Sequence, residues 1–182
     1  MAGKGVSAIK TREPGGSPNA EEIRRLVVEG EPGRWEGFTE ALLMVTARRS
    51  HVLDTIWPAL DKGQWVICDR FADSTMAYQG YGRGIERGKL KALHGIAIGD
   101  FAPDLTLILD LPPQAGLGRA KGRGGGEDRF ERMDLAFHER LRSGFLEIAA
   151  AEPNRCAVID ATADADTVHQ AILEVVGDWF DL

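Results

Sequence analysis

Short apolar runs alternate along the chain with longer segments in which apolar residues recur every three to four positions. The short runs predict strands at 6–10, 66–68, 105–109 and 156–160. The longer segments predict helices at about 18–30, 39–62, 90–97, 113–123, 130–151 and 168–179. Strands that alternate with helices are typical of a parallel sheet with helices on both faces. The pattern therefore predicts a three-layer α/β fold, with residues 1–182 as one domain.

Local signals refine several of these elements. Ser17 before Pro18 resembles a helix N-cap followed by proline in the first turn. The strand at 105–109 is almost continuously apolar, as in parallel strands that are buried on both faces. The helix at 39–62 is expected to direct one apolar stripe toward the core, formed by Leu42, Val45, Val52, Ile56 and Leu60.

Composition narrows the class of protein. The chain has 182 residues, of which 43% are hydrophobic and 27% charged, and this excludes a disordered tail or a coiled-coil rod. Its apolar runs are far shorter than the roughly 20 residues that cross a bilayer, so no membrane segment is expected. Cys68 and Cys156 lie in apolar runs and are interpreted as small core residues. Two cysteines and no secretion signal favour a reducing compartment, the cytoplasm.

The charge balance bears on possible partners. A net charge of −6 argues against stable binding of nucleic acid. Arginine nevertheless outnumbers lysine by sixteen to six, and the planar guanidinium matches phosphate and carboxylate groups. The excess permits small phosphorylated ligands, and the base composition of the genome explains it equally well.

Polar residues follow three of the predicted strands, at the sheet edge where ligands of open α/β folds bind. They are Arg12-Glu13, Asp69-Arg70 and Asp110. An isolated Asp-Arg pair at a strand end is commonly a surface ion pair that contributes little. Because two arginines share this edge, a phosphate site is the favoured interpretation.

Two helical segments carry candidate binding residues. Met44 and Arg48 are four positions apart and share one helix face, as do Ser74 and Tyr78. The side-chain amide of Gln79 offers both donors and an acceptor, which suits the edge of a nucleobase. An ordinary half-buried tyrosine is the alternative interpretation of Tyr78.

A basic, glycine-rich segment covers residues 119–129. Its cationic side chains can close over a phosphoryl group and neutralise developing charge, although a solvated loop is the alternative. They are Arg119, Lys121, Arg123 and Arg129. The four histidines lie in helical patterns without the spacing of metal ligands and are interpreted as helix-face residues.

Several segments together resemble bacterial thymidylate kinases, in the order of that family and over essentially the whole chain. They are Thr11-Arg12-Glu13-Pro14-Gly15-Gly16, Asp69-Arg70-Phe71, Ser74-Thr75-Met76-Ala77-Tyr78-Gln79-Gly80, Gly82-Arg83-Gly84, Pro103-Asp104-Leu105-Thr106-Leu107 and Asp128-Arg129-Phe130-Glu131. The resemblance implies a P-loop nucleoside-monophosphate kinase fold. It also implies transfer of the ATP γ-phosphoryl group to dTMP, use of Mg²⁺, and a homodimer.

The resemblance also implies roles for single residues. Arg70 would hold the dTMP phosphate, and Asp69 would organise Mg²⁺ through water. Arg48 would reach the thymine with help from Ser74, Thr75 and Gln79, and Tyr78 would pack on the deoxyribose. Arg12, Glu13 and Pro14 would line the acceptor site, and Arg119, Lys121, Arg123 and Arg129 would belong to a lid over ATP.

The sequence departs from the family in two ways. Met44 stands where the family usually has a phenylalanine that stacks on thymine, so weaker stacking is expected. No G-x-x-x-x-G-K-[S/T] segment occurs, and Ala2-Gly3-Lys4-Gly5 lacks the upstream glycine and the following Ser or Thr. We therefore expect the natural protein to start upstream, by roughly 30 residues that hold the central first strand and the P-loop.

The favoured function is phosphorylation of dTMP by ATP. A non-catalytic protein that binds dTMP or another nucleotide is one alternative, since the P-loop supplies the groups that hold the β- and γ-phosphates. A kinase for another deoxynucleoside monophosphate is the second alternative, with Met44 relaxing the choice of base.

Overall fold

The computed structural model describes residues 6–120 and 129–182. The chain divides into two compact units, formed by the described parts of Met1–Phe101 with Gly126–Arg132 and of Ala102–Gly125 with Met133–Leu182. Within the described residues, no helix combines the length and apolar character needed to cross a membrane.

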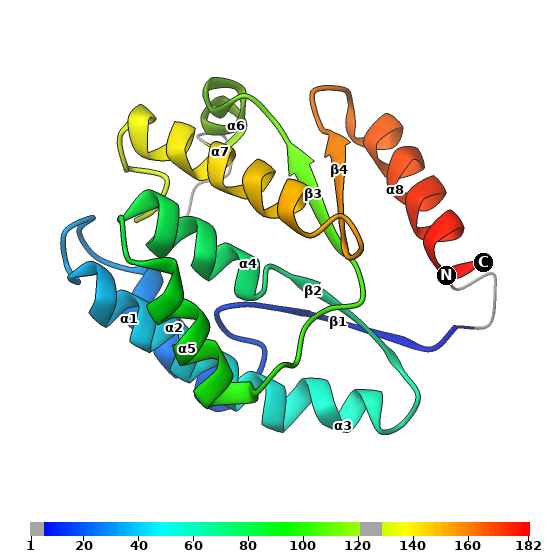
Figure 1. The fold of residues 1–182 in the computed structure, drawn as a ribbon, viewed down its shortest axis with the longest axis horizontal. Coiled ribbons are helices and arrows are strands. Elements are labelled where there is room, and N and C mark those ends of the chain that lie inside the picture. Colours follow the sequence, from blue (N-terminus) through cyan, green and yellow to red (C-terminus); the bar gives the residue numbers. More distant parts are fainter. Residues whose placement is uncertain (1–5, 121–128) are drawn as a thin grey trace. The chain divides into compact units, whose positions relative to one another are not determined.

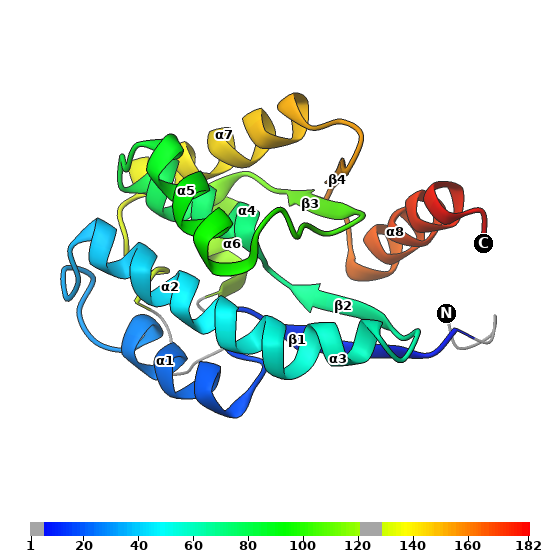
Figure 2. The same ribbon diagram turned by 60° about the horizontal axis from the view of Figure 1, so that its bottom comes forward.

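The first unit is built on two parallel strands. Strand β1 (Ala8–Arg12) pairs with β2 (Trp65–Asp69), and Arg12 lies opposite Asp69 at the carboxyl ends of both strands. Helices α1 (Pro18–Val28) and α2 (Gly37–His51) lie side by side, and α2 also contacts α5 (Arg87–Ile98) (Figure 2). The remaining helical segments are the π-helix η2 (Val52–Ile56), α3 (Trp57–Leu60), α4 (Ala72–Thr75) and the π-helix η3 (Met76–Gly82).

Local signals explain the helix boundaries of this unit. Ser17 is the N-cap residue of α1 and Pro18 its first helical residue, as predicted. Glu36 caps α2 by accepting hydrogen bonds from the backbone N–H groups of Phe38 and Thr39. The helix predicted at 39–62 is interrupted by η2, and the π turn shifts the faces of the following residues.

The core of the first unit contains part of the predicted stripe. Val52 and Ile56 pack with Phe71 and Ile98 in one buried cluster. Leu42 and Leu60, by contrast, are 42% and 41% exposed, so the prediction that they face the core is wrong. The spacing of apolar residues predicts which of them share one helix face. Whether each end of that face is buried depends on the segments that pack over it.

The second unit also contains one parallel pair. Strand β3 (Thr106–Asp110) pairs with β4 (Cys156–Asp160), and Asp110 lies opposite Asp160. Helix α7 (Leu135–Ala151) contacts both strands and α8 (Ala165–Phe180) contacts β4 (Figure 1). Helix α6 is Pro113–Ala120. The predicted helix start at 130 is wrong, because Asp134 caps α7 by accepting from the backbone N–H of Phe137.

The α/β class with parallel strands is confirmed. The described strands form two separate pairs, β1–β2 and β3–β4. Leu109 on β3 is 50% exposed, so the prediction that this strand is buried on both faces is wrong for Leu109. Ile67 on β2 is also 48% exposed.

The turn after β1 is fixed by close contacts with α2. The Glu13–Pro14 peptide bond is cis, and Gly15 and Gly16 have φ of 121° and 84°. The Thr11 hydroxyl and His51 Nε2 share a hydrogen bond of 2.7 Å beside Gly16. A Cβ on Gly16 would lie 2.4 Å from His51 Nε2 and 2.5 Å from Thr11 Oγ1. Glycine is therefore needed here both for its backbone conformation and for space.

We expect Gly16→Ala to lower the free energy of unfolding by about 2–4 kcal/mol, because backbone strain and steric overlap add. Gly63→Ala is the matched control, since Gly63 has a φ of 68° but no heavy atom lies within 4 Å of the position that a Cβ would take. The control is expected to lose only about 1 kcal/mol. Urea denaturation measures both variants, and equal losses would contradict the steric account.

An ion pair links β3 to α7 in the second unit. Arg142 donates from Nε and one Nη to the two carboxylate oxygens of Asp110, both at 2.7 Å. This hydrogen-bonded guanidinium holds the pKa of Asp110 below its ordinary value. The polar residue predicted at the end of this strand is thus engaged within its own unit.

The lowered pKa predicts a pH-dependent effect of Asp110→Asn. A carboxyl group whose pKa is lower in the folded state stabilises the fold above its unfolded pKa of about 3.9, and this contribution is lost as pH falls through the folded value. The variant should therefore melt at a lower temperature than the wild type at pH 7, and the difference should shrink below about pH 4. Thermal melts from pH 3 to 7 measure this difference in melting temperature. Glu174→Gln is the control, because Glu174 is exposed. A difference that stays constant with pH would contradict it.

Candidate functional site

A cavity of about 200 Å³ opens within the first unit. Its walls come from the turn after β1, from α1 and α2, from residues 70–79, which run from the end of β2 into η3, and from residues 130–131. The lining residues are Glu13, Pro14, Arg24, Val28, Met44, Arg48, Arg70, Phe71, Ser74, Thr75, Tyr78, Gln79, Phe130 and Glu131.

A buried ion pair forms the floor of this cavity. Arg48 Nε donates to Glu13 at 2.8 Å, and Arg48 Nη2 donates to the Thr75 hydroxyl at 2.8 Å. His51 Nδ1 lies 3.1 Å from the other carboxylate oxygen of Glu13. Among the described residues, the second amino group of Arg48 has no hydrogen-bond partner. Glu13 and Thr75 therefore hold the guanidinium in place, and its second amino group can donate to a ligand.

Arg70 enters the cavity from a strained backbone position. Its φ is 68°, a conformation that costs free energy in any residue except glycine and that concentrates at functional sites. The guanidinium carbon lies 5.1 Å from the centre of the Tyr78 ring. The Cys68 thiol donates to the Arg70 carbonyl at 3.0 Å, and burial raises the pKa of that thiol. Cys68 is thus a neutral support for the turn and not a nucleophile.

Aromatic and apolar side chains complete the walls. The Arg48 guanidinium carbon lies 5.1 Å from the centre of the Phe71 ring. Tyr78 and Phe130 meet edge to face, with ring centroids 5.2 Å apart. Met44 adds a flexible thioether to the same cavity. Flat apolar walls beside two guanidinium groups suit a planar heteroaromatic ring that carries an anionic group.

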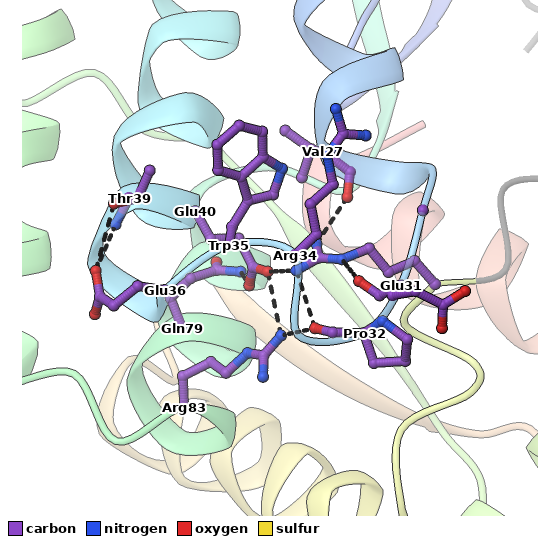
Figure 3. A network of polar contacts seen from close by, with 12 residues as sticks. Val27, Glu31, Pro32, Arg34, Trp35, Glu36, Thr39, Glu40, Gln79 and Arg83 are labelled. Atoms are coloured by element: carbon purple, nitrogen blue, oxygen red, sulfur yellow. Dashed lines mark hydrogen bonds and ion pairs between the residues drawn. The ribbon is translucent and has the colours of Figure 1, made fainter.

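A second buried carboxylate lies behind the cavity. Glu40 accepts hydrogen bonds from Arg129 at 2.6 Å, from Gln79 at 2.8 Å and from Arg83 at 3.3 Å. Figure 3 shows Gln79 and Arg83 directed at Glu40, next to the loop that carries Glu31 and Pro32. Glu40 and Gln79 are both completely buried.

The structure gathers most of the predicted acceptor-site residues. Nine of them line the cavity, namely Glu13, Pro14, Met44, Arg48, Arg70, Ser74, Thr75, Tyr78 and Gln79. Arg12 instead pairs with Glu21, with Nη2 and Oε2 3.1 Å apart, and Asp69 is exposed at the end of β2.

The predicted lid residues have different environments. Arg129 is buried and donates to the carbonyls of Val27, Glu31 and Pro32 as well as to Glu40. Arg119 lies in the second unit and donates to three carbonyls, those of Ala161, Thr162 and Ala163. Lys121 and Arg123 lie outside the described residues.

Sequence reasoning missed the polar residues that support the cavity. His51, interpreted as a helix-face residue, is completely buried against Glu13. Its position three residues after Arg48 places both side chains on one helix face, but this spacing does not show whether that face is buried. Glu40 gave no signal, because its partners lie 39 to 89 residues away in the sequence. Arg83 belongs to one of the segments that carry the resemblance, but no role was predicted for it.

Comparison with known proteins agrees with this geometry. The family model described as thymidylate kinase matches residues 1–172. A thymidylate kinase of Caulobacter vibrioides is 56% identical over 172 residues, which are 94% of this chain and 82% of that protein. A thymidylate kinase of Jannaschia sp. is 51% identical over 174 residues, covering 96% of this chain and 83% of that protein.

A solved structure supports the same relationship. The crystal structure of thymidylate kinase from Ehrlichia chaffeensis matches with a TM-score of 0.74 and 35% identity, covering 93% of this chain and 80% of that one. The family match, the identities near 50% and the shared fold all point the same way. The chain belongs to the thymidylate kinase family of phosphotransferases.

Proposed function

We propose that the cavity of the first unit is the dTMP site of a kinase that transfers the γ-phosphoryl group of ATP to dTMP and yields dTDP. The observation that carries this proposal is the arrangement of Arg48, Arg70, Phe71 and Gln79 around one cavity. It combines cationic donors for a phosphate with a flat wall and an amide for a base.

Arg70 is the phosphate ligand in this proposal. Its strained backbone is held by the Cys68 thiol, and its guanidinium is held over Tyr78. Arg24 donates to the Pro14 carbonyl at 2.7 Å and fixes the turn that forms the opposite wall. A guanidinium that already packs against a ring loses less side-chain entropy on binding phosphate than one without such a contact.

Phe71 and Met44 are the apolar lining residues proposed to pack against the base. Arg48 has a free amino group that can donate to a ring carbonyl, and the amide oxygen of Gln79 can accept from a ring N–H. Ser74 and Thr75 line the same region, and Tyr78 packs on the deoxyribose and disfavours a ribose 2′-hydroxyl. Arg12, Glu13 and Pro14 belong to the acceptor side.

The ATP side is proposed from residues outside this cavity. Asp69 is a single exposed carboxylate at the end of β2, and no cluster of three metal-ligating side chains occurs in residues 6–120 and 129–182. A lone carboxylate fits Mg²⁺, which keeps several waters and binds phosphate oxygens. When bound, Mg²⁺ would neutralise charge on the phosphates. Arg119, Lys121, Arg123 and Arg129 are the proposed lid, with Arg129 as its anchor.

Three finer properties complete the proposal. A homodimer is part of the proposal because the thymidylate kinase family, to which the chain belongs, implies it. A cytoplasmic location is supported by two free cysteines. The net charge of −6 argues against stable binding of nucleic acid.

Binding and turnover distinguish the candidate functions. A coupled assay with dTMP, ATP and Mg²⁺ measures turnover, and calorimetry with dTMP alone measures binding. Turnover supports the kinase. Binding of dTMP without turnover supports the second candidate, a non-catalytic nucleotide-binding protein. Tighter binding of another deoxynucleoside monophosphate would overturn the assignment to dTMP.

We expect Arg70→Ala to weaken dTMP binding by about 10- to 100-fold, since charge-assisted hydrogen bonds contribute most of the phosphate recognition. Thymidine, which lacks the phosphate, should bind both proteins equally. Arg49→Ala is the control, because Arg49 is exposed and donates to the Ala97 carbonyl away from the cavity. Equal loss of dTMP and thymidine binding would contradict a phosphate role for Arg70.

A further inference from the structure

The carboxylate of Glu40 is shared by three side chains, two from residues 79–83 and one from position 129. Its Oε2 accepts from Arg129 at 2.6 Å and from Arg83 at 3.3 Å, and its Oε1 accepts from Gln79 Nε2 at 2.8 Å. Both oxygens therefore act as acceptors, so only the NH₂ end of the Gln79 amide can face Glu40. The carboxylate thus determines the assignment of the Gln79 amide, with Nε2 toward Glu40 and Oε1 on the other side.

The other end of the same amide lacks a partner. Gln79 Oε1 is buried and has no hydrogen-bond partner within the described part of the chain, and Gln79 lines the cavity. A buried acceptor without a partner is costly, and such groups are rare in folded proteins. An N–H donor on a ligand in the cavity would remove this cost.

We propose that Glu40 is a positioning residue that sets the base specificity of the cavity by fixing the orientation of the Gln79 amide. This inference rests on the proposed function of the cavity. With its oxygen toward the cavity, Gln79 accepts from a ring N–H, which thymine and uracil carry at N3. Cytosine has a lone pair at the same ring position, so two acceptors would meet, and that base is rejected.

Glu40 is itself held in place. Arg129 also donates to the carbonyls of Val27, Glu31 and Pro32. Arg83 donates to the Pro32 carbonyl at 2.9 Å (Figure 3). These bonds immobilise both arginines against the loop between α1 and α2. The Glu40 carboxylate therefore has little freedom to rotate, and it fixes the orientation of the Gln79 amide that donates to it.

The orientation matters because an amide can turn over at little cost when nothing distinguishes its ends. Without an obligate acceptor at position 40, the NH₂ end of Gln79 could face the cavity and favour a base with a ring acceptor. The discrimination between thymine and cytosine is thus controlled by a residue that does not line the cavity.

Glu40→Gln tests this, because the new amide can donate or accept and no longer dictates the orientation of Gln79. Calorimetry with dTMP and dCMP, without ATP, measures the ratio of the two affinities. We expect this ratio to fall about 10-fold, mainly through weaker dTMP binding. Glu40→Asp keeps the negative charge beside the arginines but withdraws the carboxylate from Gln79, and it should lower the same ratio while folding more readily.

Two controls separate positioning from a general loss of stability. Glu36→Gln removes the N-cap carboxylate of the same helix and should lower the melting temperature without changing the affinity ratio. Gln79→Met removes the amide at similar size, so adding Glu40→Gln to it should leave the ratio unchanged. A folded Glu40→Gln or Glu40→Asp variant with the wild-type ratio would overturn the inference. An undiminished effect of Glu40→Gln in the Gln79→Met background would overturn it as well.

The same measurements keep this inference apart from the proposed function. If the wild-type chain binds neither nucleotide, the assignment of the cavity as a dTMP site fails. If the wild type prefers dTMP and the Glu40 variants retain that preference, only the role of Glu40 fails.

Discussion

The buried ion pair between Glu13 and Arg48 is the contact on which the cavity depends. It ties the turn after β1 to α2, and through Thr75 it reaches the helical segment that follows β2. Both side chains are only 3% exposed, so each charge depends on the other for compensation. Removing one partner of such a pair typically costs about 3–5 kcal/mol, because the remaining charge stays buried. The floor of the cavity therefore depends on an ion pair in which the loss of either partner is strongly destabilising.

Helix α2 carries a second buried charge two turns before the first. Glu40 is compensated by Arg83 and Arg129 in the same way that Arg48 is compensated by Glu13. One helix thus supplies a carboxylate to one network and a guanidinium to another. The cavity residue Gln79 donates to Glu40 in the first network, and Thr75 accepts from Arg48 in the second. Fixed polar groups of this kind favour binding because their orientation is determined before the ligand arrives.

The sequence predicted the elements and the motif residues better than it predicted their environment. Strand β4 follows from an apolar run and the start of α1 from a proline at the first helical position, and both signals are local. Arg70 lines the cavity, as its place at a strand end predicted. The burial of His51 depends on which segments pack over α2, and no local pattern contains that information. Glu40 was not predicted, because a carboxylate in the first turn of a helix is ordinarily explained by the helix dipole. Its burial only becomes apparent once Arg129, 89 residues later, is placed beside it.

The excess of arginine over lysine has a structural cause in addition to any ligand. Arg119 and Arg129 each donate to three backbone carbonyls, and Arg48 divides its donors between Glu13 and Thr75. A lysine has one charged nitrogen at the end of a flexible chain and cannot span acceptors spaced this widely. The planar fork thus lets one side chain close a loop, as Arg129 does, or hold a carboxylate while it keeps donors for a ligand, as Arg48 does. The two interpretations of the arginine excess, ligand binding and a neutral compositional bias, are therefore joined by a third, in which the guanidinium holds the loops that shape the cavity.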